Sequence, residues 1–432
     1  MIIQMRKKGL PILLRIIIPL SFTFYCLPFS FAQQAEILKL DKLIEEALKN
    51  NPDLIAAKKR WEASLVRIPQ SKSLDNPNLS LSFMKIQKGT LKLDRTMPED
   101  RILSISQMFP LFGKLSLRRK IALVESQMFA AEFKNKELEI IDEVKNAYYE
   151  LFLNYKEIEL KQESLKLLEE IAKIAEAKYI VGEIPQEEVL KINLEIARLS
   201  NDITNLKQEN KAKQARLNSL LNRQPEDILG TPVLEETLSF DKDIDTLYRL
   251  TLENQPELLI FSYAIEKNKY AKSLAKRSFF PDLMTEIGLR GFTSVGIGPW
   301  DLMLAFTVPF WFWTKQRYEI KEAIFNLEEA EAAYKAMKNK ILLEVKDLAT
   351  KIEVAKNKIK LYKENLIPIL EASIESSLAG FRSGKGDFMM LLDTERMLIE
   401  TKMSYYQVLV EYNMNLADLE RTVGIQLSEV KK

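Results

Sequence analysis

The sequence lacks histidine and contains little cysteine or glycine. Its 432 residues include no histidine, one cysteine and 13 glycines. Without histidine, neither a Ser-His-Asp triad nor a histidine-ligated zinc or haem site can form. The side chain that most often titrates near neutral pH is also missing. The phosphate-binding patterns GxxxxGK[ST] and GxGxxG do not occur either. These absences argue against most enzyme classes and favour a long, helix-rich chain that performs no catalysis.

Charge is balanced once a basic N-terminus is set aside. The chain has 63 lysines and arginines against 61 aspartates and glutamates, and its first 32 residues hold four basic residues and no acidic one. Residues 33–432 therefore carry a formal charge of −2. Nucleic-acid-binding proteins usually keep a basic excess, so the balance disfavours nucleic acid as a partner.

The first 32 residues have the pattern of a secretory signal peptide. A basic stretch through Arg15 precedes an apolar run over 16–27, and Ser30-Phe31-Ala32 provides the small-x-small cleavage pattern. A retained membrane anchor is the alternative, but it needs ~20 apolar residues. Arg15, Pro19 and Pro28 leave too few, so we expect secretion.

The single cysteine, Cys26, lies inside this segment and is preceded by Tyr25. Lipoprotein processing requires a small residue at that position, so an unlipidated chain is favoured while lipidation stays open. Cleavage after Ala32 would leave a mature chain without cysteine, which excludes disulfides and metal–thiolate sites. No run of ~18 apolar residues occurs after residue 32. Any later insertion into a membrane would therefore use strands.

The rest of the chain contains an internal repeat with a period near 200 residues. Residues 43–54 recur at 247–258 with an offset of 204, and each copy has a proline after an amide residue, Asn-Pro or Gln-Pro. The offset is 202 between Gly182 and Gly384. Landmarks in one order at nearly constant spacing predict two structural copies. The predicted organisation is a signal peptide (1–32), a first repeat (33–230), a linker or equatorial segment (231–243), a second repeat (244–426) and a C-terminal tail (427–432).

Each copy is predicted to contain an opening helix, two strands, a long helix and a return helix. Period-two alternation predicts the strands, and coiled-coil spacing with almost no proline predicts the long helices. The opening helices are expected at 40–74 and 244–278, the strands at 79–87, 102–109, 283–292 and 301–309, the long helices at 114–181 and 315–382, and the return helices at 186–222 and 388–423. Each return helix is about half as long as the long helix. We therefore expect an opening helix to stack end to end with each return helix, alongside the long helix.

The strand pattern has two interpretations. One apolar and one small polar face, over about 9–11 residues, suit a strand that crosses a bilayer, but a soluble half-buried hairpin has the same period. Aromatic residues gather at the strand ends, at Phe109, Phe112, Trp300 and 310–313. Tryptophan concentrates at membrane interfaces, so these residues favour the membrane interpretation.

Together these landmarks resemble the TolC-like outer-membrane efflux family. The resemblance rests on the helix-Asn-Pro-x-Leu opening and, in order along the mature chain, on Phe109-Pro110-Leu111-Phe112-Gly113-Lys114, Tyr179-Ile180-Val181-Gly182, Phe280-Pro281-Asp282-Leu283, Phe381-Arg382-Ser383-Gly384 and Leu391-Leu392-Asp393. It implies a mainly α-helical fold with a small β part. Three chains would contribute four strands each to a twelve-stranded transmembrane β-barrel, and their long coiled coils would continue it as a periplasmic α-barrel.

The same resemblance implies a passive role and a set of partners. Members of the family form homotrimeric exit ducts in outer-membrane lipid, with no enzymatic activity and no cofactor. They dock to a periplasmic adaptor (membrane fusion protein) and to an inner-membrane pump of RND or ABC type, and the pump chooses the cargo. The implied function is an outer-membrane channel of a tripartite efflux or type I secretion system.

In this family the two helix–turn–helix tips form the periplasmic entrance and the grooves where the adaptor docks. The matching residues here are Tyr179, Val181, Gly182, Phe381 and Gly384. Helix capping and coiled-coil packing are the alternative roles of these residues, and capping is certainly part of what the glycines do.

The family commonly narrows its entrance with acidic side chains after the second tip. Asp393 matches one such position, and Glu188 can supply an acid after the first tip. A second acidic position falls on Met390, and the expected basic partner falls on Gly386, beside Lys385. A ring of three Asp393 carboxylates would favour cations at the constriction. A solvated aspartate on a helix face is the alternative.

Two other classes remain open at this point. A periplasmic coiled-coil adaptor or scaffold is the runner-up, although adaptors usually carry one hairpin between β-rich halves. Carboxylate-only catalysis, as in glycosidases, survives the lack of histidine, but no glycine-framed carboxylate pair suggests it. Five methionines between 389 and 414 could hold soft metal ions. Filling the helical core is the favoured role for them.

Overall fold

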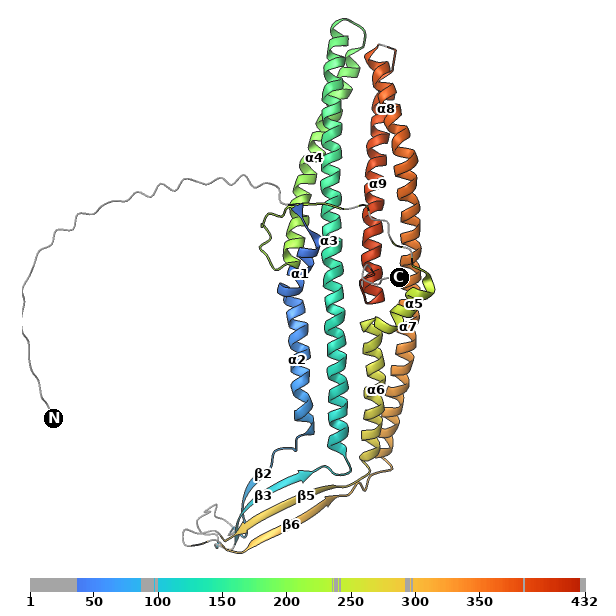
Figure 1. Cartoon of the computed structure of the whole chain (residues 1–432). Helices are drawn as coiled ribbons and strands as arrows, with labels where there is room; N and C mark the ends of the chain where they lie inside the picture. The colour runs from blue at the N-terminus through green and yellow to red at the C-terminus, as the bar shows by residue number, and fades with distance from the viewer. Residues whose placement is uncertain are drawn as a thin grey trace, which may run out of the picture. The chain divides into compact units, whose positions relative to one another are not determined.

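The computed structural model describes residues 37–86, 97, 100–234, 236, 240, 242–291, 296, 298–383 and 385–427. The predicted signal peptide with Cys26, the turn residue Gly384 and the tail after Leu427 lie outside the described residues. Within these limits the fold is mainly α-helical with a small sheet, as predicted (Figure 1). In the described part of the chain, no helix is long and apolar enough to cross a membrane.

The helices of the first copy form one long track and one divided track. Their bounds are α1 (Leu40–Asn50), α2 (Pro52–Lys72), α3 (Lys114–Ile180) and α4 (Gln186–Leu220). Figure 1 shows α4 and α2 following one another along α3. This arrangement confirms the predicted stacking of an opening helix on a return helix.

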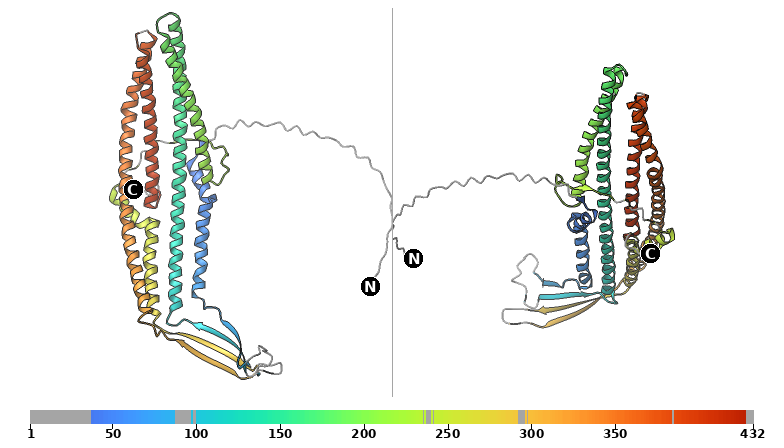
Figure 2. Two further views of the ribbon diagram at one scale, coloured as in Figure 1. Left: turned by 180° about the vertical axis from the view of Figure 1, so that it is seen from behind. Right: turned by 45° about the horizontal axis from the view of Figure 1, so that its top comes forward.

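The second copy repeats the arrangement. Its helices are α5 (Ile244–Asn254), α6 (Pro256–Arg277), α7 (Gln316–Leu361), α8 (Ile367–Arg382) and α9 (Phe388–Val423). The outgoing track of α7 and α8 runs beside α9 and α6, which Figure 2 shows from behind.

The opening helices restart at the amide–proline steps. The Asn51 side chain accepts the backbone N–H groups of Asp53 (2.9 Å) and Leu54 (3.2 Å), so it caps α2. Its Nδ2 donates to the Leu220 carbonyl at the end of α4 (3.0 Å). Proline needs no N–H partner in the first helical turn. Asn51 therefore ends one helix, starts the next and joins both to the return helix.

The two return helices end in the same backbone conformation. Asn222 after α4 has φ +58° and Gly424 after α9 has φ +89°, and the two residues are 202 positions apart. Asparagine tolerates the left-handed region and glycine enters it freely. At Gly424 a Cβ would also lie 2.7 Å from the Asn254 carbonyl oxygen. The internal repeat thus extends to the geometry of the helix ends.

The four longer strands form one antiparallel sheet in the order β2-β3-β5-β6 within the described residues. Their bounds are β2 (Asn78–Phe83), β3 (Arg101–Phe109), β5 (Asp282–Arg290) and β6 (Trp300–Thr307). The central pair joins the two copies, with Ser104 opposite Gly288. The sheet is therefore shared by the two repeats.

Three strands end earlier than the alternation predicted. The first was expected over 79–87, but β2 stops at Phe83, and Lys85 has a positive φ of 54°; residue 87 lies outside the described part. β5 stops before Gly291, which has φ +68°. β6 stops at Thr307, ahead of Pro309, which has no N–H for a ladder.

The second long helix is divided, which corrects the prediction of one helix over 315–382. A π-helical turn at Tyr362–Leu366 separates α7 from α8. Pro368 follows directly, and a proline ring clashes with the carbonyl four residues earlier in a regular helix. The wider π turn accommodates that residue without ending the track. The first return helix is also shorter than predicted, ending at Leu220 rather than residue 222 because the chain turns through Asn222.

A hydrophobic cluster lies where the opening and return helices of the first copy meet. Tyr148 of α3 is 2% exposed, and its hydroxyl lies 2.9 Å from the Leu38 carbonyl oxygen and 2.8 Å from that of Val233. The hydroxyl also accepts the Val233 N–H at 2.9 Å. Leu38 belongs to β1 (Ile37–Leu38), which pairs in parallel with β4 (Thr231–Pro232). Tyr148 therefore fastens the start of the described chain and the linker segment onto α3.

Candidate functional site

The first helical tip is a glycine turn after α3. Gly182 has φ +77°, and its N–H donates to the Tyr179 carbonyl at 3.0 Å. No atom lies within 4 Å of a Cβ built at this glycine, so glycine is required there for its conformation and not for space. Lys178 and Glu183 form an ion pair of 2.9 Å across the turn.

The second tip is closed by Asp387, which caps α9. Its Oδ1 accepts the Met389 N–H at 3.0 Å, and the N–H groups of Lys385 and Gly386 both reach the Gly380 carbonyl at 3.0 Å. A Cβ at Gly386 would lie 2.7 Å from the Phe381 nitrogen. Gly386 therefore has no room for the basic residue of the family pattern. The predicted tip residue Gly384 lies outside the described residues.

The two tips pack against each other through a buried apolar cluster. Phe381 is 2% exposed and its ring lies 5.9 Å from that of Phe388. Leu168 and Ile171 of α3 and Ile192 of α4 belong to the same cluster. Of the predicted docking residues, Phe381 thus lies in the core of the paired tips, where it holds the two turns together.

The end of α3 at the first tip exposes apolar side chains. Tyr179 is 44% exposed and Val181 is 69% exposed. Ile180 between them, which the sequence interpretation left out, is 81% exposed. Exposed aliphatic side chains at the end of a helical hairpin suit a contact with another protein. Tyr179, Val181 and Gly182 remain predictions as docking residues, and Ile180 joins them.

A groove between the tips holds one of the predicted gate residues, Glu188. It has a volume of about 470 Å³, and its lining includes Glu188 of α4 and the core residue Phe381. Met390 and Asp393 lie further along α9, exposed and three residues apart, which puts them on one face of the helix. In the described part of the chain, no basic side chain forms an ion pair with Asp393. Glu188 and Asp393 therefore occupy different places.

A buried acid that the sequence interpretation missed lies between the two hairpins. Glu395 of α9 is 4% exposed, and the Ser164 hydroxyl of α3 donates to its Oε1. Burial raises the pKa of Glu395, the Ser164 hydrogen bond opposes that rise, and Glu195 adds to it. Beside it, Arg396 and Glu195 form an ion pair of 2.8 Å. A polar contact thus crosses the seam between α3 and α9.

A signal for Glu395 was present in the sequence. Phe388, Leu391 and Leu398 are buried in the same seam, and their spacing puts residue 395 on the same face. Together with Ser164, Glu395 lines a cavity of about 540 Å³ between α3, α4 and α9.

A second polar network crosses between α3, α7 and α9. Burial raises the pKa of Asp142 to about 7, and the neighbouring Asp418 adds to the rise while Arg421 lowers it. Arg421 contacts Asp142 at 3.7 Å and Glu344 at 3.1 Å. Lys145 and Glu420 pair at 2.5 Å next to them. These contacts tie the two long tracks and the last return helix together.

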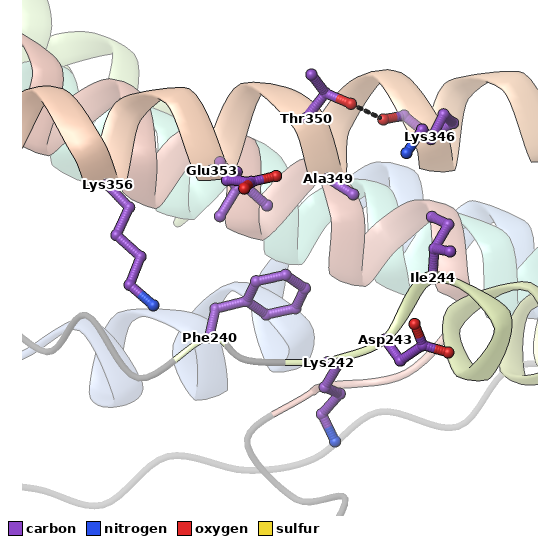
Figure 3. Close-up of a pocket in the computed structure, with 10 residues that line it drawn as sticks. Phe240, Lys242, Asp243, Ile244, Lys346, Ala349, Thr350, Glu353 and Lys356 are labelled. Atoms are coloured by element: carbon purple, nitrogen blue, oxygen red, sulfur yellow. Dashed lines mark hydrogen bonds between the residues drawn. The ribbon is translucent and has the colours of Figure 1, made fainter.

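A cavity of about 330 Å³ lies between the linker segment and α7. Figure 3 shows Phe240 lying against α7 and one hydrogen bond among the residues drawn, from Thr350 to the Lys346 carbonyl at 2.8 Å. The charged ends of Lys242, Asp243 and Lys356 do not converge on a common point in this view. We interpret this cavity as the packing contact of the linker rather than a ligand site.

The sequence matches the family model of the outer membrane efflux protein over residues 43–223 and 247–424. Among curated relatives, it is 22% identical to the probable outer membrane lipoprotein SilC of Salmonella typhimurium, over 89% of this chain and 86% of that protein. It is 20% identical to the cobalt-zinc-cadmium resistance protein CzcC of Cupriavidus metallidurans, over 90% of each. Among solved structures, the fold matches the outer membrane protein VceC of Vibrio cholerae with a TM-score of 0.75 and 17% identity, over 89% of this chain and 96% of that one.

Proposed function

The chain belongs to the outer membrane efflux protein family, and from this premise we propose that it is the exit duct of a tripartite efflux or type I secretion system. The family assignment makes it an efflux protein of the outer membrane. In the proposed assembly, three chains form a passive conduit that receives cargo from a periplasmic adaptor and an inner-membrane pump of RND or ABC type. No chemistry is required of the duct itself.

The observation that carries the proposal is the sheet with two open edges. β2 pairs only with β3, and β6 pairs only with β5, within the described chain. The outer edge of each of these two strands is therefore open. Their side chains are apolar and exposed, as at Leu79 (73%) and Leu304 (58%). Open, apolar edges promote uncontrolled pairing unless they are closed. Three copies joined edge to edge would give a closed barrel of twelve strands, which satisfies every backbone group in lipid.

The length and the ends of the strands support a membrane position. β3 and β5 have nine residues each, which is the length of a tilted strand that crosses a bilayer. Trp311 (68% exposed) and Trp313 (51% exposed) stand where β6 leads into α7, at the level where tryptophan favours the membrane interface.

The first experiment tests assembly and conduction together. The full chain, purified in detergent, should crosslink to a trimer, and after insertion into a planar lipid bilayer it should give discrete conductance steps. A monomer that is soluble without detergent and inserts into no bilayer would refute the proposed duct. It would support the alternative of a periplasmic adaptor or scaffold.

We infer that Asp393 sets ion preference at the entrance, because its exposed carboxylate has no cation partner in the described residues and would recur three times in a trimer. The Asp393→Asn variant should conduct with a weaker preference for K⁺ over Cl⁻ in a salt gradient. Asp347→Asn is the matched control, since Asp347 is an exposed aspartate of α7. Equal reversal potentials for all three proteins would leave Asp393 a solvated surface residue.

Docking at the tips is proposed for the exposed end of α3, including Tyr179, Val181 and Gly182. The double variant Ile180→Asp/Val181→Asp puts charge into this apolar patch and should abolish export in cells while trimers remain. Ile228→Asp, at an equally exposed position (74%) in the loop after α4, should export normally. Normal export by the tip variant would exclude this patch as the docking surface.

A further inference from the structure

Exposed aromatic side chains form a continuous group where the sheet joins the helices, which we call the aromatic corner. It consists of Phe112, Phe280, Phe310, Trp311, Phe312 and Trp313. The Phe112 and Phe280 rings lie 4.7 Å apart, and those of Phe312 and Trp313 lie 4.8 Å apart. These rings come from the starts of α3 and α7 and from the step between α6 and β5. Figure 1 shows all three places at one end of the helices, beside the sheet.

Basic residues concentrate at the same level. The four helix ends next to the sheet, at 67–77, 111–121, 269–282 and 309–322, contain thirteen lysines and arginines against four acids. The whole chain has 63 basic and 61 acidic residues. We call the thirteen side chains the basic collar. The four segments therefore carry an excess of nine positive charges.

One member of the basic collar forms an ion pair in the described residues. Lys114 is buried, and its Nζ donates to Asp282 Oδ1 and to the Phe280 carbonyl, both at 2.8 Å. Arg277 donates to the Phe112 carbonyl without meeting an acid. Lys120 lies 5.3 Å from the centre of the Tyr270 ring. Lys114 thus joins the start of α3 to the sheet. It is the one collar residue whose charge is paired with a carboxylate in the described residues.

The other twelve basic side chains have no carboxylate oxygen within 4 Å in the described residues. Arg118, Lys315 and Arg317 are exposed examples. At the far end of the strands the described charges are matched instead, with Lys85 next to Asp100 (3.1 Å) and Arg290 next to Asp301 (2.9 Å). Unmatched charge is thus a property of the helical end of the sheet.

We propose that the basic collar binds the headgroup phosphates of anionic phospholipids in the membrane leaflet that faces the helices. The inference rests on the proposed function, because it requires the sheet to lie in a bilayer. Long basic side chains beside interfacial aromatics reach headgroups while their stems cover apolar surface. Arginine forks match phosphate oxygens, and each lysine or arginine close to an anionic surface strengthens binding. An acidic protein partner would account for the charge but not for the aromatic rings continuous with it.

Two tryptophans of the aromatic corner offer a local test. Replacing Trp61 and Trp300 with phenylalanine leaves Trp311 and Trp313 as the only fluorescent tryptophans of the chain. This protein is inserted into vesicles of phosphatidylcholine and phosphatidylglycerol in which one lipid at a time carries bromine, which quenches tryptophan on contact. The ratio of the two quenching curves gives the relative binding of the two lipids at the corner.

We expect phosphatidylglycerol to be enriched about tenfold at the corner at low salt. The Arg118→Gln/Lys315→Gln/Arg317→Gln variant should reduce the enrichment severalfold, because it removes three of the exposed charges that attract anionic headgroups. Salt at about 0.5 M should weaken it in the wild type by screening. The matched control, with glutamine at exposed lysines 166, 207 and 211 of α3 and α4, should behave like the parent.

The outcomes separate this inference from the proposed function. A protein that enters no vesicle would overturn both. A protein that inserts normally but shows equal quenching by the two brominated lipids, with no effect of the collar variant, would overturn the lipid site alone. If the collar variant shows no change in quenching but fails in export, the charge serves a protein partner and the proposal is wrong.

Discussion

Replacing Asp142 with asparagine should stabilise the folded chain at high pH and change little at low pH. Burial raises the pKa of Asp142 from 3.8 to about 7. A carboxyl with a higher pKa in the fold than in the unfolded chain binds more protons when folded, so stability falls as pH rises. The loss begins near pH 4, grows up to about pH 7 and is constant above that. Asparagine does not titrate and can still donate a hydrogen bond to Asp418.

The pKa difference sets the size of the effect. At about 1.4 kcal/mol per pKa unit, a rise of roughly three units from 3.8 to about 7 corresponds to about 4 kcal/mol above pH 7. Arg421 loses its 3.7 Å contact with Asp142 in the variant but keeps Glu344 at 3.1 Å. The Asp142 side chain is partly accessible to solvent, which screens the charge and returns part of the gain. We therefore expect about 2 kcal/mol at pH 8 and a negligible difference at pH 3.5.

Thermal unfolding followed by circular dichroism at 222 nm, in detergent between pH 3.5 and 8, measures this difference. The matched control is Asp347→Asn, because Asp347 is 56% exposed and pairs with Lys351 on one helix; such pairs contribute less than ~1 kcal/mol. Its difference from wild type should stay small at every pH. A constant offset between Asp142→Asn and wild type, or a destabilised variant at pH 8, would refute the assignment of a proton to Asp142.

Three further substitutions test separate parts of the fold. Gly424→Ala combines a positive φ with a Cβ placed 2.7 Å from the carbonyl oxygen at the end of α5, and should lower the free energy of unfolding by more than ~2 kcal/mol in denaturant titration. In Gly182→Ala the new Cβ meets no atom within 4 Å, so the loss should be about 1 kcal/mol. Equal losses for the two variants would contradict this account. Tyr148→Phe leaves the Val233 N–H without the hydroxyl it donates to, and should lower stability by about 1–3 kcal/mol in the same titration. Glu395→Gln removes a carboxyl whose pKa burial raises above 4.5, so its advantage over wild type should grow with pH above that value, and melting curves with no such trend would refute the raised pKa.

Periodicity was sufficient to predict the elements that repeat, and it failed where one residue overrides its surroundings. The coiled-coil spacing and the glycine turns predicted the helical tracks to within one or two residues at most ends. Periodicity did not predict the π turn before Pro368, because a proline can end, kink or widen a helix and the outcome depends on packing. Strand ends at Lys85 and Gly291 depend on single positive φ values, which alternation does not encode.

The candidate site was less accessible to sequence reasoning, because it depends on which hairpin faces which. The resemblance located both tips and left docking and coiled-coil packing open for Phe381, which contact with Phe388 buries. Glu395 and Ser164 lie 231 positions apart, so nothing local links them. Spacing could have placed Glu395 in the buried seam, but only the tertiary structure supplies its partner.

The pairing of β3 with β5 constrains the order in which the chain can fold. These strands come from different repeats, so the sheet centre cannot form until residue 290 has been synthesised, and β6 closes it only at Thr307. Closing a loop of that length costs entropy before any contact repays it. Until then β3 can pair only with β2, and its second edge stays open. Neither half of the chain therefore holds the complete sheet.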